Sequence, residues 1–284
     1  MKSLFQGEFE FSYTDFKDYK KCPRRFALKF KSRIEKFWFR AGNSRKYLEG
    51  WCVHKCAELW NKKGHWAPGW MLGAVVREDA SPPGSPKIFS VGLDPEKSNL
   101  LPLLLKEYLR KNNVFWRPGE TEESVLKDIR WGLGQLEYWV LTLEMNHDKM
   151  DSEKKFRLHL PQLRIVLRGS VDMLDSRLPD IYDLKYSKDN YVDWDQLLWY
   201  DFAMTTLLDK KIRRVYTFNP LNDQPLEDRE YSKDDLAELC EDLTETIMDI
   251  RAGKLDPVPE RGECCRCPVA RGCDACAYKP CDQV

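Results

Sequence analysis

Four cysteines, one near the start of the chain and three near its end, constrain the fold most. Cys22 lies in KKCPRRF, and the stretch ECCRCPVARGC contains Cys264, Cys267 and Cys273 in a C-x2-C-x5-C spacing. Thiolates spaced so closely favour zinc or an iron–sulfur cluster, because both accept tetrahedral sulfur donors. One such site would hold together segments almost a whole chain apart. We therefore expect the fold to bring the two ends of the chain close to each other.

The composition is typical of a globular protein. The 284 residues can form one large domain or two modest ones, and 42% are hydrophobic while 32% are charged. No apolar run approaches the length of a membrane-spanning helix, and MKSLFQGEFEF does not resemble a signal peptide. Ten cysteines without a secretory signal favour a reducing compartment, where clustered thiols bind metal more often than they pair. We expect a cytoplasmic protein without membrane contact.

Charge is distributed unevenly although the formal net charge is zero. Residues 1–46 carry thirteen Lys and Arg against five Asp and Glu, whereas residues 223–256 carry four basic against twelve acidic residues. One interpretation is that two solvated helical faces attract each other. The other is that the basic stretch, with its interleaved aromatic residues, forms a nucleic-acid-binding groove in which Trp38 and Trp51 stack on bases.

The first half of the chain predicts helices. Ser12 is a candidate N-cap with Asp15 three residues on, and this helix should stop before Pro23. Further helices are predicted over residues 44–62, 99–113 and 120–147. Residues 64–95 are rich in Gly and Pro and predict a loop-rich insertion with short strands. Most tryptophans, among them Trp131 and Trp199, fit positions where helices pack.

The hydrophobic period changes near residue 155. LRIVLRGSVDML and DIYDLKYS are strand-like runs separated by a turn-like SRLPD, which predicts a hairpin. A helix over 193–209, a strand in IRRVYTFNP and a capped helix over 232–253 follow. Helices followed by strand–strand–helix–strand–helix indicate an α/β or α+β fold with one central mixed sheet flanked by helices.

The predicted hairpin carries the residues with the clearest chemistry. Asp183 and Lys185 lie on one face of their strand, because side chains two apart point the same way, and Asp172 can reach them from the neighbouring strand. Two carboxylates and the main-chain carbonyl of Leu184 would form an oxygen-rich site for Mg²⁺ or Mn²⁺. The lysine could orient or deprotonate an attacking water and stabilise a pentacovalent phosphate. The D…D-x-K pattern also arises by accident in exposed strand pairs.

Three further signals accompany this pattern. His54, in a G-x3-H motif on the second predicted helix, could complete a metal shell, although a lone helical histidine is more often structural. Gln196 and Tyr200 form Q-x3-Y and lie one helical turn apart on the same face. Glu153 precedes the strands and could be an accessory acid.

The motif order S-Y-x-D-F…C-P-R-R-F, G-x3-H, E, R-G-x-V-D, D-L-K-Y, Q-x3-Y and C-x2-C-x5-C resembles the iron–sulfur branch of the RecB-like PD-(D/E)xK nucleases. That branch includes CRISPR-associated adaptation exonucleases and AddB-type recombination nucleases. The resemblance covers residues 12–60 and 153–276, and its nuclease and cysteine motifs are independent signals. Residues 64–145 match no motif.

The resemblance implies functional roles for two groups of residues. The metal-dependent active site would consist of His54, Asp172, Asp183 and Lys185. A [4Fe–4S] cluster would be held by Cys22, Cys264, Cys267 and Cys273. Gln196 and Tyr200 match the motif that places the DNA strand and the active-site lysine. Asp183 stands where many relatives have Glu, which shortens the reach to metal.

Extra cysteines leave the cluster ligands open. Cys265, Cys276 and Cys281 lie within or beside the C-terminal motif, and zinc is the alternative to iron and sulfide. We expect the cluster to be structural, because it would clip the N-terminal helix to the C-terminal tail. Cys52, Cys56 and Cys240 fall on helical stripes and are expected to be small core residues.

We therefore predict a metal-dependent DNA nuclease, in particular an exonuclease acting on single-stranded or frayed DNA ends in recombination, repair or CRISPR adaptation. Proteins of those pathways are the expected partners. A catalytically silent iron–sulfur module that binds DNA ends or docks on a complex is the alternative, and a zinc-stabilised interaction protein is the third class. The predicted domain spans residues 1–284, with basic helices at 1–60, an insertion at 64–150, a nuclease core at 153–256 and a cysteine-rich tail at 257–284.

Overall fold

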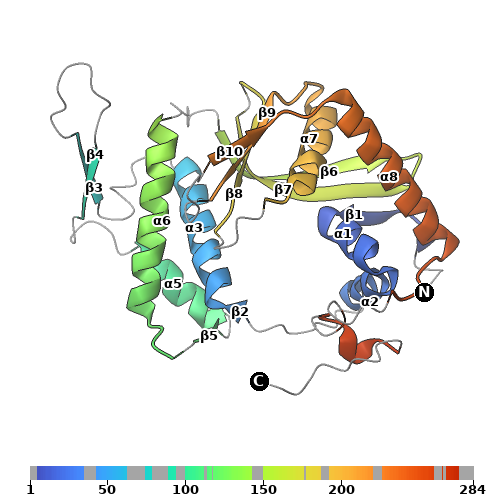
Figure 1. Cartoon of the computed structure of the whole chain (residues 1–284), viewed down its shortest axis with the longest axis horizontal. Helices are drawn as coiled ribbons and strands as arrows, with labels where there is room; N and C mark the ends of the chain where they lie inside the picture. Colours follow the sequence, from blue (N-terminus) through green and yellow to red (C-terminus); the bar gives the residue numbers. More distant parts are fainter. Residues whose placement is uncertain are drawn as a thin grey trace.

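The computed structural model of the chain is shown in Figure 1. It describes residues 5–34, 43–62, 74–78, 89–93, 100–111, 114–116, 118–142, 150–175, 177–186, 192–219, 226–258, 264 and 267–274. Within these ranges, no helix is both long and apolar enough to span a membrane.

One mixed sheet organises the larger part of the molecule. Its strands are β1 (Phe9–Ser12), β6 (Met150–Leu160), β7 (Ile165–Asp175), β8 (Asp180–Leu184), β9 (Arg214–Phe218) and β10 (Leu226–Arg229). The order is β1-β7-β8-β9-β10, and β6 also pairs with β7. The β1–β7 and β8–β9 pairs are parallel, and the other pairs are antiparallel. This confirms the predicted mixed sheet and the predicted β7–β8 hairpin.

Four helices complete what we call the sheet half of the molecule. They are α1 (Tyr13–Lys21), α2 (Pro23–Ile34), α7 (Trp194–Leu208) and α8 (Lys233–Ala252). Capping boxes start α1 at Ser12 and α8 at Ser232, and Gly253 ends α8 with a φ of 83°, a left-handed conformation that glycine adopts without strain. Their apolar faces share one core with the inner face of the sheet (Figure 1).

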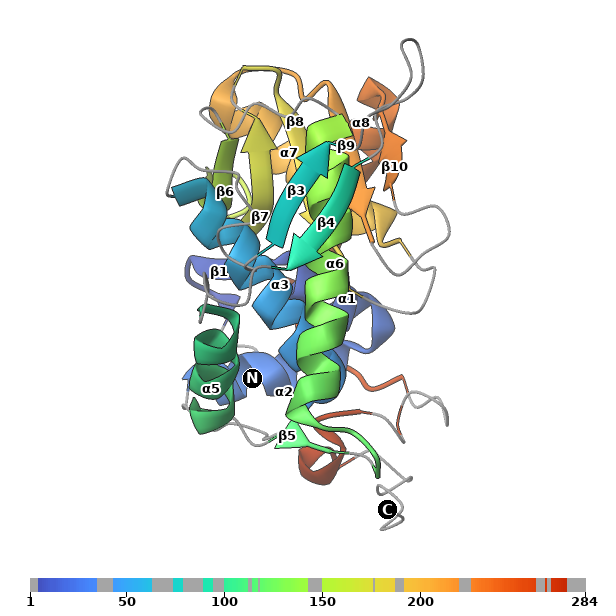
Figure 2. The same ribbon diagram turned by 90° about the vertical axis from the view of Figure 1, so that its left-hand side faces the viewer.

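Three helices from the middle of the chain form the helical half. They are α3 (Arg45–Lys62), α5 (Leu100–Lys111) and α6 (Glu122–Thr142), and Figure 2 shows α6 running beside α3. Two short strand pairs accompany them: β2 (Asn43–Ser44) with β5 (Val114–Phe115), and β3 (Ala74–Glu78) with β4 (Phe89–Leu93). This half has its own core, which includes the ends of β6, β7 and β8.

Several sequence predictions need correction. The strand β1, the strand β10 and the helix α2 were not predicted. Trp199 lies in the core as expected, against Phe11 and Phe16, whereas Trp131 is 50% exposed on α6 because its neighbours Ile129 and Leu133 take the buried face. Within the predicted insertion 64–95, only β3 and β4 lie among the described residues.

The long β6–β7 hairpin passes from one core to the other. Val171 and Leu174 of β7 belong to the sheet-half core, whereas Met173 belongs to the helical-half core. On β6, Glu153 lies between Ser152 and Lys154, which pair with Met173 and Val171, so Glu153 stands opposite Asp172. Its φ of 50° is unusual for a residue inside a strand. On the face that Val171 and Met173 share, the hairpin therefore changes its packing partner at the position of these two acids.

Candidate active site

Three of the predicted or suspected site residues converge at this junction. His54 comes from α3, Glu153 from β6 and Asp172 from β7, and one ligand atom of each lies within 4.8 Å of the other two. His54 Nδ1 is 3.5 Å from Asp172 Oδ1 and 3.9 Å from Glu153 Oε1. An imidazole and two carboxylates in this arrangement are a suitable ligand set for a divalent cation.

The backbone of Glu153 supports a functional reading of this group. A left-handed φ costs a non-glycine residue on the order of 1–3 kcal/mol, and such strain concentrates at functional sites. The Ser170 hydroxyl also holds the Glu153 carboxylate, at 3.3 Å. From the sequence, Glu153 is expected only as an accessory acid, because no pattern places it opposite Asp172 before the hairpin register is known.

Asp183 and Lys185 lie beside this group at the end of β8. Lys185 Nζ is 2.8 Å from Asp183 Oδ2, and Asp183 is only 3% exposed. That oxygen is buried, and the Lys185 ammonium group is its ion-pair partner. A buried carboxylate at this position also suits a divalent cation, because Mg²⁺ and Mn²⁺ prefer carboxylate oxygens as ligands.

The main chain of Leu184 contributes to the site through its N–H. It donates a hydrogen bond of 2.7 Å to Asp172 Oδ2, so one oxygen of Asp172 is fixed by the backbone while the other faces His54. The predicted metal-binding role of the Leu184 carbonyl stays a prediction.

The pKa values of these groups shift in opposite directions. Burial, together with the Asp172 charge, raises the pKa of Asp183 to about 6. Burial also opposes ionisation of Asp172, but His54 and the Leu184 amide outweigh it and hold the Asp172 pKa below its usual value. Burial disfavours the charged form of His54, yet Asp172, Asp183 and Glu153 raise its pKa to about 9. The cluster therefore attracts positive charge, which a proton or a metal ion can supply.

The α7 helix positions the lysine. Lys185 Nζ donates to Gln196 Oε1 at 3.0 Å, and Gln196 Nε2 donates to the Tyr200 hydroxyl at 2.7 Å. Asp193 caps this helix and accepts from the Gln196 N–H. The Q-x3-Y motif thus reaches the D-x-K strand through direct hydrogen bonds, as one helical turn of spacing allows.

Tyr186, which the sequence analysis did not select, ties the strand to the helical half. Its hydroxyl donates to the Asp128 carbonyl on α6 at 2.7 Å. A Cβ at Gly132 would stand 2.5 Å from the Tyr186 ring, so this contact requires glycine. The one signal in the sequence for Tyr186 is its position directly after Lys185. Its contact with α6 is visible only in the structure.

The described cysteines of the proposed cluster gather at the other side of the sheet half. Cys22 follows α1 and donates its N–H to Asp18 O at 2.9 Å, and the Cys267 N–H donates to Cys264 O at 3.2 Å. The pKa of Cys267 is raised, first by burial and also by Cys22 and Cys273, which places these thiols near one another. The segment containing Ala270–Gly272 lies beside α2 (Figure 1). The region around Cys22 and the segment 267–274 therefore lie close together, but the cluster-ligand assignment stays a prediction.

The other described cysteines differ in burial. Cys52 and Cys56 are buried in the helical-half core, as predicted, whereas Cys240 is half-buried on α8 and belongs to neither core, so the prediction of a core residue is wrong for Cys240. Cys265, Cys276 and Cys281 lie outside the described residues.

Many positive charges of α1 and α2 are paired internally. Asp18 binds Arg25 at 2.7 Å and Lys29 at 2.5 Å, and Asp15 binds Arg33 at 2.6 Å. Two lysines of α1 reach across the sheet half, Lys17 to Asp193 and Lys20 to Asp242 on the acidic helix α8. Among these pairs, Lys20–Asp242 alone joins the basic and the acidic stretch, so the interpretation of two mutually attracting helical faces holds for that pair, while the other cations are paired mostly within their own stretch. Trp38 lies outside the described residues.

The fold and this arrangement of residues are those of a nuclease class. The chain belongs to the PD-(D/E)XK nuclease superfamily, whose family model matches residues 10–279. A solved structure from Eubacterium rectale, described as a "putative exonuclease", shares the fold with a TM-score of 0.50 and 13% identity, over 96% of this chain and 88% of that one. No curated protein matches the chain. Family membership supports nuclease activity on DNA, with His54, Glu153 and Asp172 as a candidate divalent-metal site.

Proposed function

We propose that the protein is a metal-dependent DNA exonuclease that acts on single-stranded or frayed ends. The observation that carries the proposal is the convergence of His54, Asp172, Asp183 and Lys185 from three different elements and the chain that follows β8. The exonuclease mode is supported by the family resemblance of the motifs and by the description of the Eubacterium rectale protein. The whole chain would act as one nuclease domain.

Each residue has a specific role in the proposed reaction. His54, Asp172 and Asp183, with Glu153 and the Leu184 carbonyl, would hold Mg²⁺ or Mn²⁺. When bound, the metal supplies a bound water of lowered pKa and neutralises developing negative charge on the phosphate. Lys185, held by Gln196, orients the attacking water and donates to the phosphate oxygens. Tyr200 fixes the Gln196 amide so that its oxygen stays turned toward the lysine.

A [4Fe–4S] cluster held by Cys22, Cys264, Cys267 and Cys273 is the second part of the proposal. Its support is the proximity of Cys267 to Cys22 and Cys273 and the position of the segment around Ala270–Gly272 beside α2. The cluster would brace α1 and α2 against the C-terminal segment. Activity in recombination, repair or CRISPR adaptation follows from the same resemblance, and the proposed cytoplasmic location follows from ten cysteines without a secretory signal.

The experiment that tests the nuclease is cleavage of end-labelled single-stranded DNA by anaerobically purified protein with Mg²⁺ or Mn²⁺. Lys185→Ala should lose activity by about 100- to 10,000-fold, the range for a proton-transferring or charge-stabilising group. Lys211→Ala is the matched control, because Lys211 is an exposed lysine paired with Glu230 rather than with a residue of the candidate active site. Full activity of Lys185→Ala would contradict the assignment.

A wild-type protein that is folded but cleaves no DNA would favour the alternative of a silent DNA-end-binding module. Iron and acid-labile sulfide analysis tests the cluster separately. Cys264→Ser should lose iron and colour, whereas Cys240→Ser, at a half-buried position on α8, should keep both. Zinc without iron in the wild-type protein would replace the cluster with a structural zinc site.

A further inference from the structure

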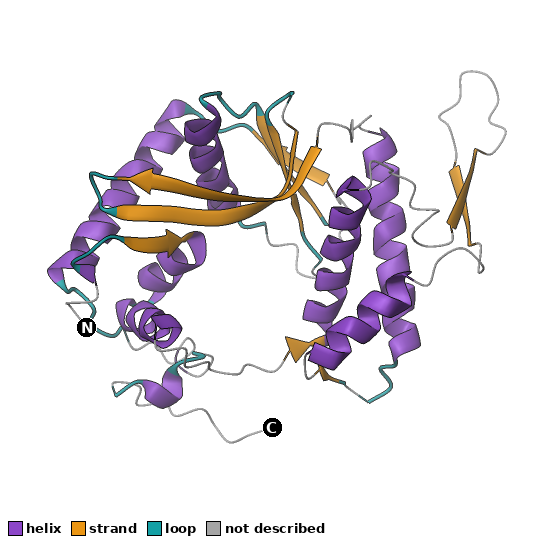
Figure 3. Ribbon diagram, turned by 180° about the vertical axis from the view of Figure 1, so that it is seen from behind, coloured by secondary structure: helices purple, strands orange, loops and turns teal. Residues whose placement is uncertain are grey.

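One face of the sheet half is basic and uncovered. On β6, side chains alternate so that Phe156 and Leu158 enter the core while Lys155, Arg157 and His159 face outward. Arg157 is 61% and His159 60% exposed. Seen from behind, the β6–β7 hairpin and β1 lie in front of the helices, and no described helix covers them (Figure 3). We call this surface the hairpin face.

The register places the basic residues of two strands side by side. Arg157 stands opposite Arg168 of β7, and Lys155 stands opposite Ser170. Arg157 and Arg168 share one carboxylate, that of Glu10 on β1, with Arg168 Nη1 3.0 Å from Glu10 Oε2. One acidic side chain therefore neutralises only one of two arginines.

The hairpin face leads directly to the candidate active site. Arg168, Ser170 and Asp172 occupy alternate positions of β7, whereas Leu167 and Val171, at the positions in between and before them, face the core. Four residues of strand correspond to about 13 Å, so Arg168 lies that far along β7 from Asp172. At the Asp172 end, α3 packs on β6 and supplies His54, so the open face ends at the metal-binding cluster.

We propose that the hairpin face is the surface along which the phosphates of a single DNA strand lie as its end enters the active site. Lys155, Arg157 and Arg168 would contact backbone phosphates that follow the one being hydrolysed. This inference rests on the proposed nuclease function and adds the path of the substrate. It is supported by charge complementarity and by continuity with the metal-binding cluster.

The helices α1 and α2 are the obvious competing surface, since the sequence there is more basic. Five of their described cations, however, are held by Asp15, Asp18, Asp193 and Asp242, so a phosphate that binds those five would have to displace existing partners. On the hairpin face, the guanidinium groups exceed the carboxylate they share. Counterion release on phosphate binding is therefore expected mainly from the hairpin face.

The test measures binding of a single-stranded oligonucleotide, with Lys185→Ala as the background in every variant so that the probe stays intact. Fluorescence anisotropy over a salt series gives Kd and its salt dependence. The double change Arg157→Gln and Arg168→Gln should weaken binding about tenfold and reduce the slope of log K against log salt by about 1.4, or about 0.7 per lost phosphate contact. Glu10→Gln should change binding in the opposite direction and tighten it.

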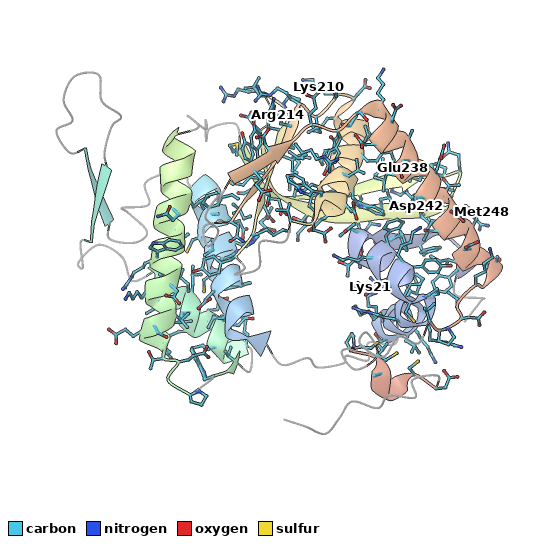
Figure 4. The ribbon with its side chains drawn as sticks, in the orientation of Figure 1. Lys21, Lys210, Arg214, Glu238, Asp242 and Met248 are labelled. Carbon is cyan, nitrogen blue, oxygen red and sulfur yellow. The ribbon has the colours of Figure 1, made fainter. Side chains whose placement is uncertain are left out.

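The matched control is Arg214→Gln, which also removes an exposed strand arginine, 48% exposed and paired with Asp228 of the neighbouring strand. Arg214 lies at the opposite end of the sheet half, beside Lys210 (Figure 4). Unchanged Kd and slope in the double variant, or an equal loss in Arg214→Gln, would overturn the proposed path. The nuclease itself is decided separately by cleavage with the wild-type protein, because these binding measurements do not depend on turnover.

Discussion

The two halves of the molecule contribute unequally to the candidate active site. The sheet half is built from both ends of the chain and supplies Asp172, Asp183, Lys185 and Gln196, whereas the helical half is built from the middle and supplies His54. The carboxylates lie where the β6–β7 hairpin passes between the two cores. The site therefore depends on how the halves are joined as well as on the residues each carries.

The joint itself is small and specific. Tyr186 crosses from the end of β8 to α6, where its hydroxyl bonds Asp128 O and its ring lies against Gly132. Because Lys185 directly precedes it, the same strand end carries a catalytic candidate and the contact between the halves. This arrangement suggests that changes in the helical half can reach the lysine through one aromatic ring.

Removing the helical half's contribution should have the largest effect. His54→Ala should lower single-turnover cleavage by at least about 10- to 100-fold and raise the metal concentration needed for half-maximal rate, because the metal loses a ligand. Circular dichroism should show an intact fold, since His54 is a partly exposed side chain at the junction. Wild-type metal dependence in this variant would mean that the sheet half alone forms the metal site.

Disturbing the joint should destabilise the protein next most strongly. Gly132→Ala places a methyl group 2.5 Å from the Tyr186 ring, and the required shift should cost about 1–3 kcal/mol of unfolding free energy and reduce cleavage. Gly134→Ala on the same helix is the matched control, because nothing lies within 4 Å of its new Cβ. Gly134→Ala should stabilise α6 by up to about 1 kcal/mol. Equal effects of the two changes would argue against the proposed joint.

A buried acid in the sheet half should give a pH-dependent effect of smaller size. Burial raises the pKa of Asp201 to about 6, against the opposing hydrogen bond from Thr205 and the charge of Lys211. Proton binding then favours the folded state, so this contribution is complete below about pH 4 and is lost as pH rises through 6. Asp201→Asn should raise the free energy of unfolding by about 1–2 kcal/mol at pH 7.5. The Asn side-chain oxygen can still accept the hydrogen bond that the Thr205 hydroxyl donates to Asp201.

Thermal unfolding over a pH series checks this prediction. The gain should shrink to nothing near pH 4, where the wild-type side chain is also neutral. A gain in unfolding free energy that does not change with pH would show that ionisation of Asp201 is not its cause. Gly132→Ala is the control, because it involves no titrating group and its effect on stability should be the same at every pH.

The ion pair between α1 and α8 should matter least. Lys20 and Asp242 are each 41% exposed, and exposed pairs contribute about 0–1 kcal/mol. Figure 4 shows Asp242 with Glu238 and Met248 along α8. Lys20→Gln should therefore leave the unfolding free energy nearly unchanged, as measured by urea denaturation. If Lys20→Gln lowered the unfolding free energy as much as Gly132→Ala does, the sheet half would depend on its surface charges more than on its core.

Much of the fold was predictable because its signals are local. Capping residues at Ser12, Ser232 and Gly253 marked helix ends correctly, and alternation identified the β7–β8 hairpin. The strand β1 was missed because four residues, FEFS, carry no distinguishable pattern, and they form a strand only by pairing with β7. The helix α2 was missed because Pro23 was read as the end of one helix, although it also begins the next.

The sequence by itself determined which side chains carry the chemistry: the D…D-x-K pair of strands, the histidine, the Q-x3-Y helix and the cysteines at both ends. Only the tertiary structure decided that Glu153 joins His54 and Asp172, that Tyr186 connects the halves and that many of the charges of α1 and α2 are already paired. The physical reason is distance along the chain. Spacing within one helix or strand fixes local geometry, but contacts between segments a hundred residues apart depend on strand register and on the packing of two separate cores.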